Sequence, residues 1–242
     1  IKKLFFSLKN SIKIFDFLIK NIIRFFKPSG LFIAFIGTDG AGKTTIINSL
    51  DDFFKKGFTK NKIKYCYWRP FLFPELKKII PFKKGKDEIH GRVDRTYIRK
   101  AGIIKKSYHF IKLLYYWLDY IFGRFIYQGI RSRGGIVCFD RYWHDLLVYP
   151  ERFGLSIHPV IISFFGIFVP KPDIIFFLSG DQQEIFSRKK ELAVEEINDQ
   201  LKKYKTITNR YNNVISIDST NKSIHDTKNE VILNCLKFMS NR

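Results

Sequence analysis

The sequence predicts an α/β fold in which helices cover both faces of a five-stranded parallel sheet. Short apolar runs typical of buried strands alternate with longer segments of helical periodicity along the 242 residues. A glycine-rich loop follows the first apolar run and leads directly into a helix. Hydrophobic residues make up 45% and charged residues 27% of the chain, which is typical of a globular domain with a sizeable core.

Five apolar runs are expected to form the sheet. They cover residues 31–36, 63–68, 136–139, 173–178 and 214–217. Helical spacing of apolar or charged residues predicts helices over 46–54, 87–100, 106–132, 184–211 and 223–239. Because parallel neighbours need a long crossover connection, strands alternating with helices predict a parallel sheet with helices on both faces.

The first 27 residues read as a basic amphipathic helix, which Pro28-Ser29-Gly30 ends. We therefore divide the chain into a basic N-terminal helix, residues 1–30, and one α/β domain, residues 31–242. The formal net charge of +21 predicts attraction to polyanions. Three interpretations of residues 1–27 stay open: docking on their own domain, lying on an anionic membrane surface, and nucleic-acid binding. No recognition motif accompanies the charge, so no specific nucleic acid is expected.

Two further features bear on the compartment. The three cysteines are far apart and form no CxxC pair, which predicts buried thiols in a reducing compartment. The best candidate for a membrane span, residues 160–178, is interrupted by Pro170-Lys171-Pro172-Asp173. We expect a cytoplasmic protein, with a peripheral position on the inner face of the membrane as the alternative. The chain begins at Ile1, which leaves open what precedes it.

The glycine-rich loop carries the most specific signal in the sequence. Residues 37–44 fit the phosphate-binding pattern GxxxxGK[ST] without a mismatch. Glycines let backbone N–H groups approach phosphate oxygens, and the following helix adds its positive end. Lys43 can reach the β- and γ-phosphates, and the Thr44 hydroxyl can ligate Mg²⁺. ATP and Mg²⁺ are therefore the expected cofactors, held by Gly37, Thr38, Asp39, Gly40, Ala41, Gly42, Lys43, Thr44 and Thr45.

Three further charged positions are candidates for catalysis. Asp140 ends a predicted strand, where a carboxylate can hold a metal-bound water or orient an acceptor; the alternative is a helix cap. Arg141 offers paired donors to a phosphate, or else forms a surface ion pair. Arg188, with two following lysines, can close over a triphosphate as a cationic lid, or else lies on a solvated helix face.

Candidates for the acceptor site are more scattered. A carboxylate beside ATP is unfavourable unless it faces an acceptor hydroxyl, which assigns Asp39 to the acceptor, or else to the turn itself. Arg69 follows the second strand and is a candidate for an anionic group of the acceptor. The aromatic segment 106–132 is expected to be core and pocket wall, with acceptor stacking by Trp117 or Tyr120 as the alternative.

The segment that follows Arg141 holds further candidates. His144 and Asp145 could form an acid–base pair near the acceptor; the alternative is a structural histidine. Arg152 is a further candidate of the same kind.

The loop and the run Phe139-Asp140-Arg141-Tyr142 together resemble the thymidylate kinases, of the nucleoside monophosphate kinase family. The resemblance runs in order from about residue 32 to 239, through Lys171-Pro172-Asp173, the segment 182–190 and the segment 214–218. It implies a three-layer α/β/α P-loop NTPase fold and transfer of the γ-phosphoryl group of ATP. It also implies that Asp39 faces the acceptor sugar and that Tyr142 belongs to the substrate site.

The sequence departs from that family at two places. Trp68-Arg69-Pro70 lacks the glutamate of the usual Arg-Glu-Pro, and residues 143–150 replace the helix that reads thymine. The chain is more similar to thymidylate-kinase-like proteins associated with bacterial surface-polysaccharide genes. It shares with them Asp119-Tyr120, the Asp-Arg-Tyr-x-His-Asp run and the Arg-Lys-x-Glu-Leu run that begins at Arg188. This closer resemblance implies the fold and ATP use more than a reaction.

The sequence therefore predicts an ATP-dependent kinase acting on a small acceptor, a nucleoside monophosphate such as dTMP or a related phosphorylated compound. One alternative is a kinase for a sugar, glycan or lipid-linked acceptor in cell-surface polysaccharide synthesis. Another is an ATP-binding switch module without a metabolic reaction. A nucleic-acid ATPase lacks further helicase-type motifs. A homodimer stays open.

Overall fold

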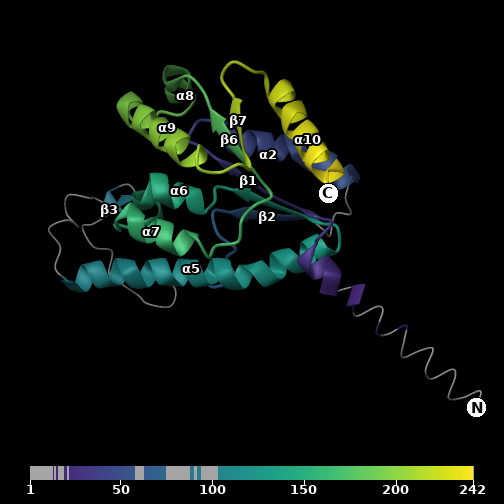
Figure 1. Cartoon of the computed structure of the whole chain (residues 1–242). Coiled ribbons are helices and arrows are strands. Elements are labelled where there is room, and N and C mark those ends of the chain that lie inside the picture. Colours follow the sequence, from purple (N-terminus) through teal and green to yellow (C-terminus); the bar gives the residue numbers. More distant parts are fainter. Residues whose placement is uncertain are drawn as a thin grey trace, which may run out of the picture.

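The computed structural model describes residues 13, 15, 19–20, 22–57, 63–74, 88–89, 92–93 and 103–241. Five strands pair in parallel in the order β2–β5–β1–β6–β7 (Figure 1). The strands are β1 Leu31–Ile36, β2 Ile63–Tyr67, β5 Ile136–Asp140, β6 Ile174–Ser179 and β7 Val214–Asp218. The predicted α/β class and five-stranded parallel sheet are confirmed.

Helices cover both faces of the sheet and make three layers. The helices are α2 Lys43–Gly57, α5 Ile103–Ser132, α6 Trp143–Val148, the 3₁₀ turn η2 Pro150–Phe153, α7 Pro159–Gly166, α8 Gln182–Arg188, α9 Val194–Thr208 and α10 Ile224–Ser240. One core lies between the sheet and α5, α6, α7 and α9. The second core lies between the opposite face of the sheet and α2 and α10.

The central strand shows why the chain folds in this way. All six residues of β1, Leu-Phe-Ile-Ala-Phe-Ile, are buried. A strand covered on both faces needs apolar side chains at every position, so its sequence does not alternate. Phe32 belongs to the core on the α5 side and Ile33 to the core on the α2 side. Its carboxyl end, at Ile36, leads straight into the glycine-rich loop.

The run Lys171-Pro172-Asp173 joins the far end of the sheet to α5. The Asp173 carboxylate accepts a hydrogen bond of 2.7 Å from the Phe32 backbone N–H. Two further hydrogen bonds of 2.7 and 2.9 Å come from the Arg131 guanidinium, near the end of α5. These contacts hold the start of β6 beside β1.

Two predicted helices differ in the structure. Within the segment 87–100, the described residues form two short antiparallel strands, β3 Glu88–Ile89 and β4 Arg92–Val93. Helical charge spacing alone therefore gave a wrong prediction for these residues. The segment predicted as one helix over 184–211 is two helices, α8 and α9, separated at residues 189–193. In the N-terminal segment, residues 22–26 are helical, whereas residues 1–12 lie outside the described residues.

Other predictions agree with the structure. The long aromatic segment forms one helix, α5, and the cysteines are free buried thiols at Cys66, Cys138 and Cys235. No helix in the described part of the chain is both long enough and apolar enough to cross a membrane. The segment 160–178 instead holds α7, a loop and the first strand residues of β6.

Candidate functional site

The glycine-rich loop, residues 37–44, turns at the carboxyl end of β1 and starts α2. Gly37 and Gly40 have φ angles of +144° and +85°, in the region that side chains rarely adopt. A Cβ atom at Gly37 would lie 2.4 Å from the Leu178 carbonyl oxygen, and one at Gly40 would lie 2.7 Å from the Ile185 carbonyl oxygen. Glycine is therefore required at both positions for the loop to pack against β6 and α8.

Lys43 is the first residue of α2 and is buried. Its ammonium donates hydrogen bonds to the backbone oxygens of Gly37 and Thr38, at 2.9 and 2.6 Å. Burial, followed by the nearby charge of Arg141, lowers the pKa of Lys43 to about 7. A bound phosphate would stabilise the charged form of this lysine and raise its pKa again.

Thr44 and Asp140 meet at the edge of the sheet. The strands β1 and β5 are neighbours in register, so their carboxyl ends emerge together and bring Asp140 beside the start of α2. The Thr44 hydroxyl donates a 2.6 Å hydrogen bond to Asp140 Oδ2. Asp140 Oδ1 is buried and has no hydrogen-bond partner among the described residues. A hydroxyl and a carboxylate with a spare oxygen fit the oxygen-ligand preference of Mg²⁺.

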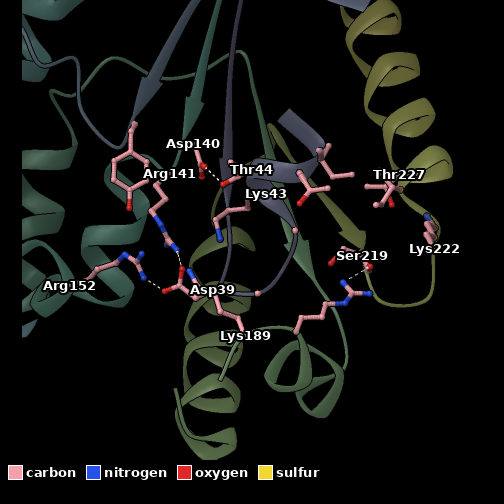
Figure 2. A pocket seen from close by; sticks show the side chains of 17 residues that line it. Asp39, Lys43, Thr44, Asp140, Arg141, Arg152, Lys189, Ser219, Lys222 and Thr227 are labelled. Atoms are coloured by element: carbon pink, nitrogen blue, oxygen red, sulfur yellow. Dashed lines mark hydrogen bonds and ion pairs between the residues drawn. The ribbon is translucent and has the colours of Figure 1, made fainter. Parts of the chain in front are cut away.

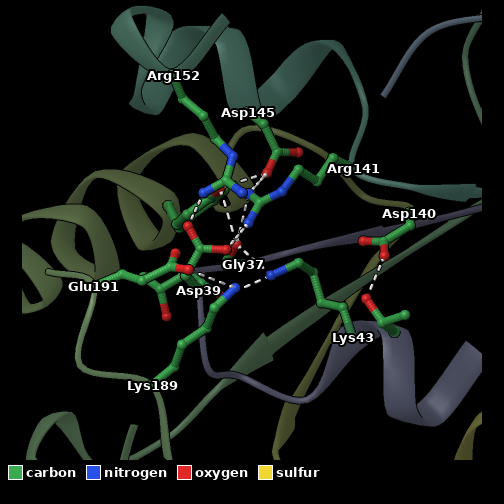
Figure 3. A network of polar contacts seen from close by, with 12 residues as sticks. Gly37, Asp39, Lys43, Asp140, Arg141, Asp145, Arg152, Lys189 and Glu191 are labelled. Carbon is green, nitrogen blue, oxygen red and sulfur yellow. Dashed lines mark hydrogen bonds and ion pairs between the residues drawn. The ribbon is translucent and has the colours of Figure 1, made fainter. Parts of the chain in front are cut away.

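Arg141 connects the loop with α6. Its backbone has a φ of +71°, and its side chain is buried. The guanidinium donates to Asp39 Oδ1 at 2.5 Å and to Asp145 Oδ1 at 2.9 Å (Figure 3). Burial alone would lower the pKa of Arg141, but the negative charge of Asp145 and smaller contributions that include Asp140 together outweigh this effect, and the pKa is raised. The arginine is therefore held in its charged form against the phosphate loop.

Asp145 is the residue that fixes Arg141 in place. Its carboxylate accepts a 2.6 Å hydrogen bond from the Tyr204 hydroxyl of α9 and a 3.0 Å bond from the Tyr142 backbone N–H. Burial raises the pKa of Asp145, and the charge of Arg141 opposes that shift. Tyr204 Oη also lies 3.2 Å from the Gly37 carbonyl oxygen. Helix α9, helix α6 and the loop are therefore joined through one carboxylate.

Asp39 is held between two arginines. Besides Arg141, the guanidinium of Arg152 in η2 forms an ion pair with the Asp39 carboxylate (Figures 2 and 3). The Asp39 side chain is buried, whereas that of Arg152 is partly exposed. Two guanidinium groups neutralise a carboxylate that would otherwise repel phosphates at the loop.

The predicted pair of His144 and Asp145 is not formed. Neighbouring residues of a helix point in directions about 100° apart. Asp145 faces Arg141, whereas the His144 ring packs against Tyr211, with the ring centroids 4.9 Å apart. Burial lowers the pKa of His144 to about 4, so that this imidazole is neutral near pH 7. His144 is therefore a structural residue on the far side of α6.

A cavity of about 500 Å³ opens at this edge of the sheet. Its volume lies within the range of small-molecule sites. Charged and polar side chains line most of it, and cations outnumber anions (Figure 2). The lining residues are Asp39, Gly40, Gly42, Lys43, Thr44, Thr45, Ile46, Tyr67, Asp140, Arg141, Arg152, Arg188, Lys189, Ser219, Lys222, Ile224 and Thr227. The cavity is suited to a polyanionic ligand.

The cationic residues Arg188 and Lys189, at the end of α8 and just after it, close one side of the cavity. The Arg188 guanidinium donates to the Ser219 carbonyl oxygen at 3.1 Å and to Glu184 at 2.6 Å. Lys189 forms a 3.2 Å ion pair with Glu191. The acidic partners, Glu184 and Glu191, are on the surface. Their ion pairs with Arg188 and Lys189 are therefore weak, and an incoming anion can replace the two carboxylates.

Four residues predicted to bind the acceptor lie behind the cavity wall. Arg69 is buried and donates to Asp119 at 2.8 Å. The Trp117 indole N–H donates to the Phe165 carbonyl oxygen at 3.0 Å, Tyr120 is fully buried, and the Tyr142 hydroxyl donates to the Pro170 carbonyl oxygen. None of the four belongs to the cavity lining. In this structure they pack the core.

Other cavity residues carry no motif in the sequence. Ser219, Lys222 and Thr227 follow the carboxyl end of β7, and Tyr67 ends β2. In parallel sheets, ligands bind outside the carboxyl ends of the strands. For Ser219 and Lys222, the position after an apolar run was therefore the only available signal. Tyr67 and Thr227 lie inside a predicted strand and a predicted helix and had none. Tyr204, inside a charged helix, had none.

The fold is similar to that of solved structures, although the sequence matches no known family. No protein-family model and no curated protein matches the sequence. Among solved structures, a thymidylate kinase from Ehrlichia chaffeensis aligns with a TM-score of 0.51 and 21% identity, over 86% of this chain and 100% of that one. A thymidylate kinase from Candida albicans aligns with a TM-score of 0.58 and 17% identity, over 87% of this chain and 93% of that one.

The fold is that of the thymidylate kinases. When only the five strands of the large sheet are numbered along the chain, the order β2–β5–β1–β6–β7 becomes 2-3-1-4-5. This order matches the sheet of the thymidylate kinases. At these identities the likeness establishes the fold and leaves the reaction and the substrate to the chemistry of the site.

Proposed function

We propose that the chain is an ATP-dependent phosphotransferase that moves the γ-phosphoryl group of ATP to a small acceptor. The observation that carries the proposal is the placing of Lys43, Thr44, Asp140 and Arg141 around one cavity at the carboxyl edge of the sheet. Phosphoryl transfer needs little covalent help from the protein and depends on positioning and on cations around the transferring group. The lining of this cavity supplies both.

Binding of ATP would begin with the phosphates at the glycine-rich loop. Lys43 would leave the carbonyl oxygens of Gly37 and Thr38, 2.9 and 2.6 Å away, and turn toward the β- and γ-phosphates. Thr44 and Asp140 would hold Mg²⁺, which would neutralise charge on the phosphates when bound. Arg188 and Lys189 would close from the side of α8.

In the transfer step, an acceptor oxygen forms a bond to the γ-phosphorus while the bond to the β-phosphate oxygen breaks. ADP leaves with that electron pair. A nucleoside monophosphate would attack through an oxygen of its phosphate dianion, which has no proton to lose, whereas a sugar acceptor would attack through a hydroxyl and pass its proton to solvent water. Arg141, held by Asp145, would stabilise charge on the moving phosphoryl group. Asp39 would accept a hydrogen bond from an acceptor hydroxyl once Arg141 and Arg152 turn to the phosphates.

The acceptor in this proposal is a nucleoside monophosphate such as dTMP, or a related phosphorylated compound. The two solved structures compared above are thymidylate kinases, and the Candida albicans enzyme is described as having broad substrate specificity. The membership in a narrower group of polysaccharide-associated proteins is a hypothesis on sequence motifs alone.

A second candidate acceptor is a sugar, glycan or lipid-linked compound. The observation that favours it concerns the segment after Tyr142. In thymidylate kinases a helix at this place reads the thymine base. Here Trp143, Leu146 and Val148 of α6 are buried in the core and offer no polar group to a base.

The test is a screen for ATP-dependent ADP release against nucleoside monophosphates and against cell-envelope extracts. We expect release that needs an acceptor and Mg²⁺ and that disappears in Lys43→Ala. Stimulation by dTMP selects the nucleotide acceptor, and stimulation by the extract alone selects the envelope acceptor. Tight ATP binding without acceptor-dependent release would reject a kinase and favour an ATP-binding switch.

A further inference from the structure

Arg69 and Arg152 were both candidates for the acceptor site, and the structure places them differently. Arg69 is 1% exposed and does not line the cavity. Its terminal nitrogens donate to Asp119 and to the carbonyl oxygens of Phe73 and Pro74, at 2.8, 3.1 and 3.4 Å. Arg152 lines the cavity, and its side chain is 22% exposed. An anion that enters the cavity therefore meets Arg152 and not Arg69.

The short turn η2 holds Arg152 at the cavity. The next residue, Phe153, packs on the ring of Trp68 just after β2, with the centroids 4.8 Å apart. The Gly154 carbonyl oxygen accepts a 2.9 Å hydrogen bond from the buried ammonium of Lys112 in α5. Because two other elements fix the turn, Arg152 faces the cavity from a rigid position.

One edge of the Arg152 guanidinium is open. Its Nη1 forms the ion pair with Asp39, whereas Nε and Nη2 have no hydrogen-bond partner in the described part of the chain. These two N–H groups lie side by side on a guanidinium and form a fork that binds two oxygens of one phosphate. Arg141 differs, because both of its terminal nitrogens already donate to the carboxylates of Asp145 and Asp39.

The open edge lies at the end of the cavity away from β7. Figure 2 shows Arg152 and Asp39 at one end, Ser219 and Lys222 at the other, and Lys43 between them. If the phosphates of ATP rest at Lys43, the two ends remain for its nucleoside and for the acceptor. The Asp39 carboxylate, which we assign to an acceptor hydroxyl, stands at the Arg152 end. The acceptor is therefore expected beside Arg152.

We propose that Arg152 binds a phosphate group of the acceptor, so that the acceptor is a phosphorylated compound and not a neutral sugar or glycan. This inference rests on the proposed function and assigns the acceptor's anionic group to η2. A phosphate in the fork of Arg152 would lie close to Arg141, because both arginines contact Asp39. Guanidinium groups would then balance the charge of the acceptor phosphate and of the transferring group in a partly buried site.

The first test measures the binding of inorganic phosphate to the full chain saturated with Mg²⁺ and a non-hydrolysable ATP analogue. The analogue occupies the glycine-rich loop, so that phosphate is left with the acceptor end of the cavity. The rise in melting temperature with phosphate concentration gives the dissociation constant. We expect Arg152→Gln to raise that constant about tenfold or more, because a charge-assisted fork is lost. Arg152→Lys keeps the charge but not the fork, and its constant should lie between the two.

Arg210→Gln is the matched control. Arg210 is an exposed arginine just after α9 and does not line the cavity. This variant should bind phosphate like the wild type. Equal losses in Arg210→Gln and Arg152→Gln would overturn the proposal, because net charge alone would then explain them. Phosphate binding that is absent in the wild type, or unchanged in Arg152→Gln, would also overturn it.

Two readouts separate this inference from the proposed function. If the ATP analogue does not bind the wild type, the proposed function itself is rejected. Arg152→Gln should still bind the analogue, which also shows that the variant is folded. In the transfer assay, Arg152→Gln should raise the KM for the acceptor about tenfold, with a much smaller change in the KM for ATP. A neutral sugar that stimulates ADP release, with a KM that Arg152→Gln leaves unchanged, would overturn this inference and leave phosphoryl transfer intact.

Discussion

The two sides of the cavity were encoded in the sequence in different ways. We call the side at the glycine-rich loop, where ATP would bind, the donor side, and the opposite side the acceptor side. On the donor side, Lys43, Thr44 and Asp140 lie at the cavity, as the sequence motifs predict. On the acceptor side, Trp117 and Tyr120 of the aromatic helix lie in the core instead. A contiguous loop fixes its own geometry through backbone constraints, whereas a side chain on a long helix faces whatever that helix packs against.

The acceptor side also shows what replaces the expected contacts. Asp39, paired with both Arg141 and Arg152, presents charged groups at the cavity. Trp117 and Tyr120, for which acceptor stacking was the alternative to a core position, lie in the core. If the comparison is right, changes on the donor side and around Arg141 act on turnover. Changes at Arg69 and Asp119, which lie away from the cavity, act on stability.

The largest expected effect is on the donor side. Lys43→Ala should lower kcat about 10²–10³-fold or more, because a cation at the transferring phosphate is lost. The exposed Lys55→Ala, later in the same helix, is the matched control and should leave kcat unchanged. Both variants are followed by ADP release with the active acceptor and by circular dichroism. Full activity of Lys43→Ala with an intact fold would contradict the assignment of the loop.

The buried pair of Arg69 and Asp119 should govern stability. Asp119 also accepts hydrogen bonds from the backbone N–H groups of Phe71 and Phe73, at 3.1 and 2.9 Å. Removing the guanidinium in Arg69→Ala leaves a buried carboxylate without its cation and should lower the free energy of unfolding by about 3–5 kcal/mol. Urea denaturation measures it. If Arg69→Ala left stability unchanged but raised the KM for the acceptor, Arg69 would be a residue that binds the acceptor, as the sequence predicted.

Asp145 should act on turnover through Arg141. In Asp145→Asn the carboxamide keeps the size of the side chain but loses the charge that holds the guanidinium. A misplaced Arg141 should lower kcat by about 10–100-fold, with a smaller effect on the KM for ATP. Asp199→Asn, at a surface ion pair with Lys203, is the control and should behave as the wild type. An equal loss of kcat in both variants, or none in Asp145→Asn, would remove Asp145 from this role.

The smallest effect concerns pH. With its pKa lowered to about 7, Lys43 is largely neutral in the ligand-free protein above that pH, so binding of ATP must take up a proton. The affinity for ATP should fall by up to about tenfold per pH unit above pH 7. Lys43→Arg stays charged, and its affinity should lack this slope. The ratio of the two affinities, measured by calorimetry, cancels the titration of ATP itself; a constant ratio would contradict the lowered pKa.

The same shift has a consequence for stability. Between pH 7 and 10.5 the unfolded chain binds a proton at Lys43 that the folded chain does not. The free energy of unfolding of the ligand-free protein should therefore gain a contribution that rises with pH across this window.

Much of the fold could be predicted from the sequence, because the three inner strands β1, β5 and β6 are short apolar runs, as burial on both faces of a sheet requires. β1 and β6 lie where their sequences predict them. The short strands β3 and β4 could not be predicted, since two residues carry no periodicity. The break between α8 and α9 also escaped the pattern, because charged residues at 189–191 suit a helix as well as a loop.

The candidate site divides in the same way. The positions of Thr44 and Asp140 follow from local sequence and from strand ends that meet at one edge. The link between Tyr204 and Asp145 joins residues 59 positions apart and depends on how α9 packs on α6. No spacing along the chain could show it.

The most direct measurement follows a label on the γ-phosphate of ATP. The protein, Mg²⁺ and the active acceptor are incubated with labelled ATP, and the products are separated. We predict that the label appears on the acceptor in amounts equal to the ADP formed, and that Lys43→Ala transfers it at least about 100-fold more slowly. Label found only in inorganic phosphate, or transfer by Lys43→Ala at the rate of the wild type, would contradict phosphoryl transfer at this loop.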